Sequence, residues 1–494
     1  MTGDESPARP DEGARPKIGT DEWVAQSEER TRRRSGPFGA LRRRVDLVPA
    51  PARLAGFVVV AAVVPFVTSS DYVVRVGAQT LIFALLTVGL NVVVGFSGLL
   101  DLGYVAFFGF GAYGYALLSS EHYGVHWPAH FSVPVIAVAS AALGLLLGLP
   151  SRRLLGDYLA ILTLFFLQAF VVFTTNGSAV SFFGLTPATN LTGGPNGISG
   201  LDPFRFLGLE IAPAEIEGFF WLALGAFVVV VTALHFLSES RTGRAWRALR
   251  EDPLAAEQMG IPVNRLKLLA FAMGAAIAGI AGTIQAPLNT GVFPSDYDLP
   301  LLVTVYAMLI LGGVGSLTGA LLGALALNVS LELLRDANQA RWIFYALILL
   351  ALVARMRPWA KLAIVAGGTL AFGLVLRTLL DALWPSATGG ALAGGDLVGR
   401  AVQSWVVQPE SSTRLIGNIG VVILIGAVLG LTLLQGRWRT VALVPTLYLA
   451  VFVWENRLVT EPSVTRFLVL GGLLVVLMTA RPQGLLGTAR VEIA

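Results

Sequence analysis

Charged side chains gather in one short segment, "SRTGRAWRALREDPLAAEQMGIP" from Ser240 to Pro262, although apolar runs flank it on both sides. Its arginines recur every third residue, so a helix would carry them along one slowly drifting stripe. These arginines are Arg241, Arg244, Arg247 and Arg250. An apolar counterpart is supplied by Leu249, Ala256, Met259 and Ile261.

A second short helix is expected inside the same segment. Pro253 suits its first turn, Asp252 its N-cap, and Gly260 its end. Two such amphipathic helices would form a surface that a soluble partner can grip. The alternative, which charge alone favours, is a basic loop that lies on lipid headgroups.

Polar residues within apolar segments form a second candidate site, because burying them in a membrane is costly and usually serves a function. The candidates for a translocation pathway are Asn91, Asp101, Tyr104, Thr163 and Gln168, with Asn328 as a further polar position. Asp101 and Tyr104 are the preferred pair, since they lie among dense glycine motifs. Hydrogen bonds between helices would explain each residue equally well, and Thr163 could bond back to its own helix.

Histidines at 122, 126 and 130 have a spacing that imitates a metal site. Gly124 and Pro128 would interrupt a continuous helix there, so an interfacial belt with Tyr123 and Trp127 is the preferred interpretation. We expect no metal ligands in this chain.

Catalytic and nucleotide-binding patterns are missing from the sequence. "GFGAYG" (Gly109 to Gly114) matches a dinucleotide fingerprint, but it lies in an apolar segment, where close helix packing is the better explanation. Gly315, Gly319 and Gly323 predict a similar smooth ridge. No Gly-Lys dipeptide occurs, which excludes a Walker P-loop, and there is no Cys. We therefore expect no enzyme and no cofactor in this chain.

Composition places these segments in a membrane. Of the 494 residues 55% are hydrophobic and 13% charged, against about 25% charged in soluble proteins. The net charge is +4. In a membrane protein an excess of basic residues usually lies in cytoplasmic loops, so we do not interpret it as a sign of nucleic-acid binding. The fold class is therefore an all-α polytopic membrane protein.

About fourteen apolar segments can be drawn, most near the length needed to cross a bilayer. The third and eighth are short and rich in glycine, so either could be re-entrant. The segments are 53–70, 75–97, 102–118, 132–149, 158–175, 217–237, 266–285, 299–313, 317–334, 342–355, 360–383, 415–435, 439–454 and 467–480.

Basic loops predict the orientation, with the N- and C-termini in the cytoplasm and the loop 176–216 outside. Residues 1–52 are predicted to be a disordered basic cytoplasmic tail. Its arginines, Arg32 to Arg34 and Arg42 to Arg44, are interpreted as part of a solvated tail that fixes the orientation, with contact to anionic lipid as the alternative. The remaining divisions are a transmembrane core 53–340 with the cytoplasmic loop 238–265, additional helices 341–465 with an external loop 385–413, and a final helix and tail 466–494.

Several motifs in fixed order resemble the branched-chain amino acid ABC importer permeases, and the LivM-type subunit in particular. The motifs are "LNVVVGFSGLLDLGYVAFFGFGAYGYALL" (Leu90 to Leu118), "GDYLAILTLFF" (Gly156 to Phe166), "LTGGPNGI" (Leu191 to Ile198), "SRTGRAWRALREDPLAAEQMGI" (Ser240 to Ile261), "LGGVGSLTGALLGA" (Leu311 to Ala324) and "RPQGLLG" (Arg481 to Gly487). "LAAEQMG" also resembles the coupling-loop signature of such permeases, with Leu254 where that signature has Glu.

The resemblance implies that the segment couples the membrane helices to an ATPase. The residues that it marks are Arg244, Arg247, Arg250, Glu251, Asp252, Ala255, Ala256, Glu257 and Gly260. It also implies a second permease subunit, two ATPase subunits and an extracytoplasmic solute-binding protein, with ATP bound by the ATPase partner subunits and not by this chain. Gln168 stands where the family often has Glu, and about 110 extra residues near 350–460 separate the late core from the ending.

These observations predict a subunit of a bacterial inner-membrane importer that moves branched-chain or other apolar amino acids by alternating access. A urea or short-amide permease of the same superfamily is a close alternative. An ion-coupled secondary transporter is an alternative of another class, which would need inverted repeats and ionisable residues at the membrane midplane.

Overall fold

The computed structural model describes most of the chain from residue 50 onward. The described residues are 50–68, 70–151, 157–180, 190–206, 208–212, 215–355, 359–392, 397–410, 413–434, 436–461, 466, 471–472 and 484. The chain forms two compact units, Met1–Val63 and Val64–Ala494. The apolar helix α3 (Ala50–Val67) begins in the first unit, and the elements after it belong to the second. The predicted tail 1–52 and the predicted last helix 467–480 fall almost entirely outside the described residues.

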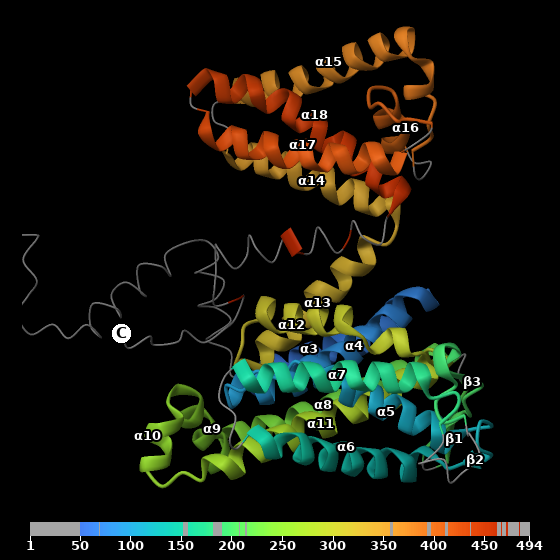
Figure 1. Cartoon of the computed structure of the whole chain (residues 1–494), viewed down its shortest axis with the longest axis vertical. Coiled ribbons are helices and arrows are strands. Elements are labelled where there is room, and N and C mark those ends of the chain that lie inside the picture. The colour runs from blue at the N-terminus through green and yellow to red at the C-terminus, as the bar shows by residue number, and fades with distance from the viewer. Residues whose placement is uncertain are drawn as a thin grey trace, which may run out of the picture. The chain divides into compact units, whose positions relative to one another are not determined.

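Long helices that lie side by side build the first part of the second unit (Figure 1). Two short helices, α9 and α10, lie at one end of this bundle, and short strands lie at the other. The helices are α4 (Asp71–Leu90), α5 (Tyr104–Leu118), α6 (Ala129–Ser151), α7 (Asp157–Asn176), α8 (Ile216–Glu239), α9 (Arg241–Glu251), α10 (Pro253–Gln258), α11 (Val263–Leu288), α12 (Leu299–Gly312) and α13 (Leu317–Leu333).

The centre of this bundle is made by α4 and α11. Their most apolar windows are 89% and 72% buried, whereas those of α6 and α7 are 28% buried. α11 packs against α5 and α6, while α4 packs against α8 and α13. Helices that are apolar all round belong in the interior of a membrane bundle, and those with an exposed side face lipid or another subunit.

The central helix α4 does not end as a regular helix. It continues as a π-helical turn, η1 (Asn91–Phe96), and then as a loop that leads into α5. Three β-branched valines fill the middle of η1, and Gly95 and Gly98 follow, a composition that weakens an α-helix. Gly98 has a φ of +72°, which ends the helix at that point. Single π-helical turns of this kind often mark functional positions.

Three two-stranded sheets close the end of the bundle opposite α9. β1 (Ser119–Ser120) pairs with β2 (Val125–His126), placing Ser119 opposite His126. β3 (Ile198–Ser199) pairs with β6 (Gly291–Val292), and β4 (Phe204–Phe206) pairs with β5 (Leu209–Ile211). All three pairs are antiparallel. β1–β2 and β4–β5 are hairpins within single loops, whereas β3–β6 joins the loop before α8 to the loop after α11.

Hydropathy predicted the positions of the helices well, but fewer of them than the fourteen apolar segments are long and apolar enough to cross a membrane within the described residues. Each predicted apolar segment up to 439–454 coincides with a helix, and nine helices of the described residues are long and apolar enough to cross a membrane. The fold class, an all-α polytopic membrane protein, is confirmed. A tenth crossing would be made by α13 together with α14 (Ala337–Arg355), which meet at a 115° bend. The third predicted segment is a short helix, as expected, but the sharp bend lies between the ninth and tenth segments and not at the eighth.

A further group of helices follows α13 and corresponds to the additional residues 341–465. They are α14, α15 (Trp359–Leu383), α16 (Leu397–Gln403), α17 (Thr413–Leu433) and α18 (Gly436–Thr460). α16 lies within the segment 385–413, which was predicted as an external loop, so part of this segment is helical. We call α14 to α18 the accessory helices.

The accessory helices are held together by an ion pair within an apolar setting. Arg341 of α14 and Glu455 of α18 are both fully buried, with Nη2 and Oε2 2.9 Å apart. The rings of Phe344 and Trp454 stack beside them, with centroids 4.4 Å apart. A buried pair is expensive to desolvate, so its benefit depends on the several hydrogen bonds that satisfy both partners.

Candidate coupling helices and polar core

The charged segment 240–262 folds as two capped helices, as the sequence predicted. Ser240 caps α9 by accepting a hydrogen bond from the Gly243 amide. Asp252 caps α10, where its Oδ1 accepts from the amides of Leu254 and Ala255 at 2.8 and 3.0 Å. Gly260, with a φ of +79°, follows the helix and turns the chain toward α11. We call α9 and α10 the coupling helices.

The inner face of α9 anchors it to the neighbouring helices. Trp246 is fully buried, and its Nε1–H donates to the carbonyl of Leu266 in α11 at 3.0 Å. On the other side, Arg244 and Arg247 donate to the carbonyls of Glu239 and Ser238 at the end of α8. Cations are favoured at a helix C-terminus, where carbonyls lack helical partners. α9 is therefore firmly attached to the bundle.

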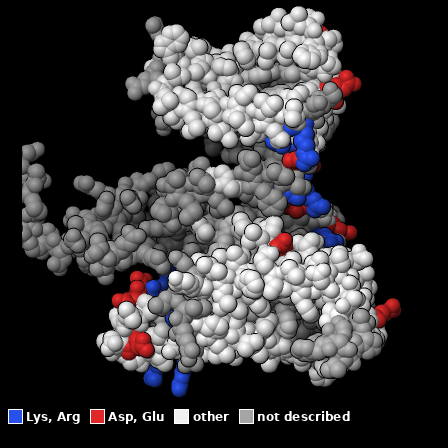
Figure 2. All heavy atoms as spheres, in the orientation of Figure 1, with Lys and Arg blue, Asp and Glu red and all other residues white. Residues whose placement is uncertain are grey.

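The outer face of the coupling helices combines charge with exposed apolar side chains. Leu254 is 74% exposed and Met259 is 83% exposed. Met259 was predicted to belong to the apolar face with Leu249 and Ala256, but only these other two are buried. Figure 2 shows charged side chains gathered at these helices, beside a largely uncharged surface over the long helices. An apolar tip with a charged rim is typical of a surface that binds another protein.

The nine residues predicted for coupling differ in their exposure to solvent. Ala256 is buried, Arg250 is half-buried, and the others are exposed. Arg250 differs from the other arginines of the stripe because it points into the bundle. Its Nη1 donates to the carbonyl of Gly95 in η1 at 2.7 Å. The exposed ones are Arg244, Arg247, Glu251, Asp252, Ala255, Glu257 and Gly260.

Four of the five predicted pathway residues are buried around the break between α4 and α5. The side-chain oxygen of Asn91 accepts from the Gly315 amide at 2.8 Å and thus links η1 to the turn before α13. Tyr104 is fully buried, and its hydroxyl lies against Gly89 of α4, where a Cβ would overlap it. Each of these contacts joins two helices across a glycine.

Asp101 lies in the loop between η1 and α5, and hydrogen bonds from two neighbouring helices fix this loop. The Tyr306 hydroxyl of α12 accepts from the Asp101 amide at 3.2 Å and donates to the Asp101 carbonyl at 2.6 Å. The Thr163 hydroxyl of α7 accepts from the Leu102 amide at 2.8 Å and donates to the carbonyl of Ala160. Thr163 thus bonds back to its own helix, as anticipated, and also to the loop.

The Asp101 carboxylate is only partly satisfied by these contacts. Oδ1 accepts from the Gly103 amide at 2.9 Å, whereas Oδ2 is buried and has no hydrogen-bond partner in the described part of the chain. A buried carboxylate oxygen of this kind is costly and points to a functional position. Asp101 and Thr163 lie close together, because Thr163 bonds to the amide of Leu102, the residue after Asp101.

Gln168 lies apart from the other four residues. It is exposed on the outer face of α7, and its Nε2 donates to Oδ1 of Asp298, the N-cap of α12, at 3.5 Å. Tyr158, Ile161 and Phe165 are exposed on the same helix. An amide among exposed apolar side chains suits a surface that another protein covers better than one that faces lipid.

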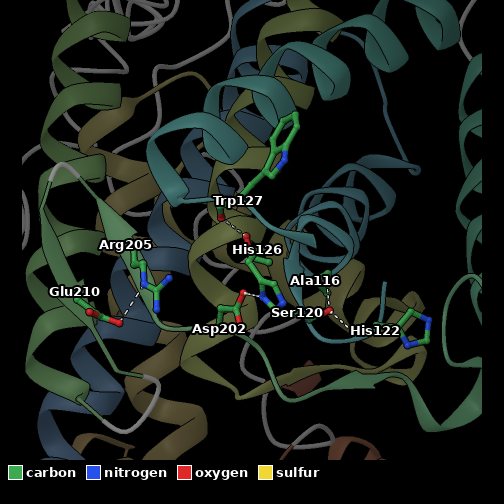
Figure 3. A network of polar contacts seen from close by, with 9 residues as sticks. Ala116, Ser120, His122, His126, Trp127, Asp202, Arg205 and Glu210 are labelled. Atoms are coloured by element: carbon green, nitrogen blue, oxygen red, sulfur yellow. Dashed lines mark hydrogen bonds and ion pairs between the residues drawn. The ribbon is translucent and has the colours of Figure 1, made fainter. Parts of the chain in front are cut away.

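The three histidines 122, 126 and 130 have separate partners, and Figure 3 shows two of them, His122 and His126, at the end with the strands. Nδ1 of His126 and Oδ2 of Asp202 are 2.7 Å apart, and the ring of His122 bonds to the carbonyl of Asn190. His130 packs on Phe131. Within the described ranges no three His, Cys, Asp or Glu residues are grouped as a metal site.

The predicted glycine surfaces are packing surfaces. A Cβ on Gly111 would overlap the carbonyl of Gly279, so α5 and α11 approach each other at their backbones. A Cβ on Gly319 would come within 2.6 Å of the Gly312 carbonyl, and one on Gly323 would overlap that of Met308, so α12 and α13 are equally close. Small residues permit such contacts in membrane bundles.

Two polar features were missed by reasoning from sequence. Tyr306 gave no signal, because a tyrosine in an apolar helix is ordinary. Arg341 and Glu455 did give one, since ionisable residues within apolar segments merit attention, but both stand near the ends of their segments. Gly484, within the predicted "RPQGLLG" ending, lies close to Gly313 at the end of α12, which ties that ending to the core.

Comparisons with known proteins agree with this architecture. Residues 72–356 match the family described as branched-chain amino acid transport system / permease component. The permease protein LivM of the high-affinity branched-chain amino acid transport system in Salmonella typhimurium is 38% identical over 329 residues, covering 62% of this chain and 72% of the relative. LivM of Escherichia coli gives the same identity and coverage.

A second group of relatives carries the name LivH. The Salmonella typhimurium protein is 28% identical over 180 residues, covering 36% of this chain and 54% of the relative. No solved structure matches the chain. With the family model covering more than half of its length and LivM aligned over most of the relative, the chain belongs to the permease components of branched-chain amino acid transport systems.

Proposed function

We propose that this chain is the LivM-type permease subunit of an ATP-driven ABC importer that carries branched-chain amino acids into a bacterial cell. It would act in the inner membrane with both termini in the cytoplasm. Its partners would be a second permease, two ATPase subunits and an extracytoplasmic solute-binding protein. The relatives support the amino-acid substrate, because their names include branched-chain amino acid transport.

The observation that carries the proposal is the pair of coupling helices. Each of the two helices begins at a residue whose side chain caps it. Trp246 anchors α9 to α11, and Leu254 and Met259 are exposed at the tip. A firmly attached protrusion with an apolar tip is suited to receive force from a soluble partner. The sequence has no Walker P-loop, so hydrolysis would take place on that partner.

Alternating access would then proceed through the central helices. Closure of the ATPase pair would pull on α9 and α10, and the bundle would open toward the outside. The solute-binding protein would release an amino acid there, near the break that holds Asn91, Asp101, Tyr104 and Thr163. Reopening of the ATPase pair would return the bundle to its inward-facing state.

A second permease subunit is favoured by the outer face of α7. Gln168 and its partner Asp298 interrupt an exposed apolar surface, and a polar pair in lipid would be costly. A protein partner would remove that cost. The LivH relatives, which are named as permease proteins of branched-chain amino acid transport, are the kind of chain that such a partner would be.

Uptake of radiolabelled leucine and urea by cells with and without the gene tests this function, with ATP depletion as a control. Gly260 offers matched variants, because a φ of +79° strains a β-branched residue but is tolerated by Asn. A Cβ at Gly260 meets nothing within 4 Å. We therefore expect Gly260→Val to lose ATP-dependent leucine uptake while it still reaches the membrane, and Gly260→Asn to retain it.

Other outcomes would redirect the proposal. Uptake of urea alone would keep the machinery and change its substrate. Uptake that follows the proton gradient, and that survives both ATP depletion and Gly260→Val, would instead indicate an ion-coupled secondary transporter and overturn the ABC assignment.

A further inference from the structure

We infer that Arg250 is the positioning residue that transmits movement of α9 to two glycine-rich breaks in the core, one after α4 and one between α12 and α13. This inference rests on the proposed function and specifies how the coupling helices act on the bundle. We call the group formed by Arg250, Asn91, Gly95, Gly98 and Gly315 the joint.

The first contact of the joint is between α9 and η1. Nη1 of Arg250 donates to the Gly95 carbonyl at 2.7 Å, and these residues are 155 positions apart in sequence. Gly95 lies in the last turn of η1, where carbonyls lack partners from the helix itself. A guanidinium that meets such a carbonyl makes a strong, charge-assisted hydrogen bond.

The second contact is with the turn between α12 and α13. A Cβ on Gly315 would overlap Nη1 of Arg250, so the guanidinium lies directly against the backbone there. Gly315 has a φ of +88°, a conformation that few other residues adopt. Its amide donates to Asn91 at 2.8 Å. One guanidinium therefore contacts both breaks, and Asn91 connects the breaks to each other.

The third contact involves the backbone of α9 itself. A Cβ on Gly98 would lie 3.3 Å from Cα of Arg250 and 3.1 Å from its Cγ. Gly98 is the residue at which the chain turns away from η1, with a φ of +72°. α9 and the break after α4 are thus in close backbone contact, so a displacement of α9 cannot leave this break unaffected.

From the joint, a displacement has a direct route to the predicted pathway. Gly98 is followed by Asp101 and Leu102, which the hydroxyls of Tyr306 and Thr163 fix to α12 and α7. Movement at Gly95 and Gly98 would therefore strain or shift the loop that holds the buried Asp101 carboxylate. Trp246, bonded to Leu266 at the start of α11, makes α9 and α11 move together.

The test measures leucine uptake and ATP hydrolysis in the same proteoliposomes, with the full chain assembled with its partner subunits. Arg250→Met removes the donor and keeps the aliphatic stem. We expect it to assemble normally, to hydrolyse ATP within about twofold of the parent, and to take up less leucine per ATP by about tenfold, a typical size for coupling between two sites. Arg250→Lys should recover part of the loss, because an ammonium can still donate to Gly95.

The control is Arg439→Met, which removes an exposed arginine of α18 and should leave uptake per ATP unchanged. A purely structural role for Arg250 predicts that folded protein, hydrolysis and uptake fall together at constant uptake per ATP, and this result would overturn the inference. Unchanged uptake in Arg250→Met would do the same. If the parent complex shows no ATP-dependent uptake, the proposed function itself has failed.

Discussion

The buried pair of the accessory helices allows a quantitative prediction. Nε of Arg341 donates to both carboxylate oxygens of Glu455 at 3.0 and 3.1 Å, and Nη2 donates to Oε2 at 2.9 Å. The Tyr345 hydroxyl adds a bond to Oε1 at 3.2 Å. Glu455→Leu would remove the carboxylate that pairs with the buried arginine, and breaking a buried pair in this way costs about 3–5 kcal/mol. The equilibrium constant for separation of α14 from α18 should then increase by roughly 10²- to 10⁴-fold.

A single cysteine can report this opening, because the natural chain contains none. Ala340 is fully buried beside Trp454 and Leu458, so a maleimide reaches a cysteine there only when α14 separates from α18. The rate of labelling of Ala340→Cys in detergent measures the opening equilibrium. We expect Glu455→Leu to accelerate this rate by the factor above.

The control replaces all three side chains of the ion pair and its tyrosine with apolar ones. Arg341→Met, Tyr345→Phe and Glu455→Leu together remove both buried charges and the hydroxyl that bonds to Glu455, so labelling should return to within about tenfold of the parent, since such replacements are often nearly neutral. The reasoning would be refuted if Glu455→Leu labelled no faster than the parent, or if the triple variant labelled as fast as Glu455→Leu.

Two further predictions concern the core. Gly111→Val would place side-chain atoms on the Gly279 carbonyl, so size-exclusion chromatography should show little folded protein. The control Gly225→Ala, where a Cβ meets nothing within 4 Å, should behave like the parent, and equal yields of the two variants would disprove the close α5–α11 contact. Trp246→Phe removes the donor to the Leu266 carbonyl and should destabilise the attachment of α9 by about 1–3 kcal/mol, seen as faster labelling of a cysteine at position 249; an unchanged rate would show that the bond is dispensable.

Much of this architecture could be predicted because it follows from local rules. Hydropathy located the helices, since a bilayer admits only segments that satisfy their own backbone hydrogen bonds. The Asp252-Pro253 pair located the start of α10, because a capping carboxylate and a proline act on the adjacent turn alone. Both kinds of signal are carried by neighbouring residues, so one sequence suffices to find them.

The missing parts depend on contacts between distant residues. The arginine stripe of α9 looked uniform, yet Arg250 alone among its arginines reaches Gly95, because the direction of a side chain depends on where its helix packs. Gln168 resembled a buried pathway residue, but α7 is a peripheral helix and exposes it. Hydropathy also separated α13 from α14 but does not report the 115° bend between them.

The kind of contact that holds the core helices together affects how easily the core can change its conformation. Within a membrane, helices gain little from burying apolar surface against one another, so close packing and hydrogen bonds determine their association. Here the joint and the loop around Asp101 use side chains that bond to backbone groups: Arg250 to Gly95, Asn91 to Gly315 and Thr163 to Leu102. Such contacts position the breaks closely, yet each depends on one or two hydrogen bonds of about 1 kcal/mol or somewhat more. A change of state in the core therefore needs only to exchange these few bonds and does not require the helices that they join to unfold.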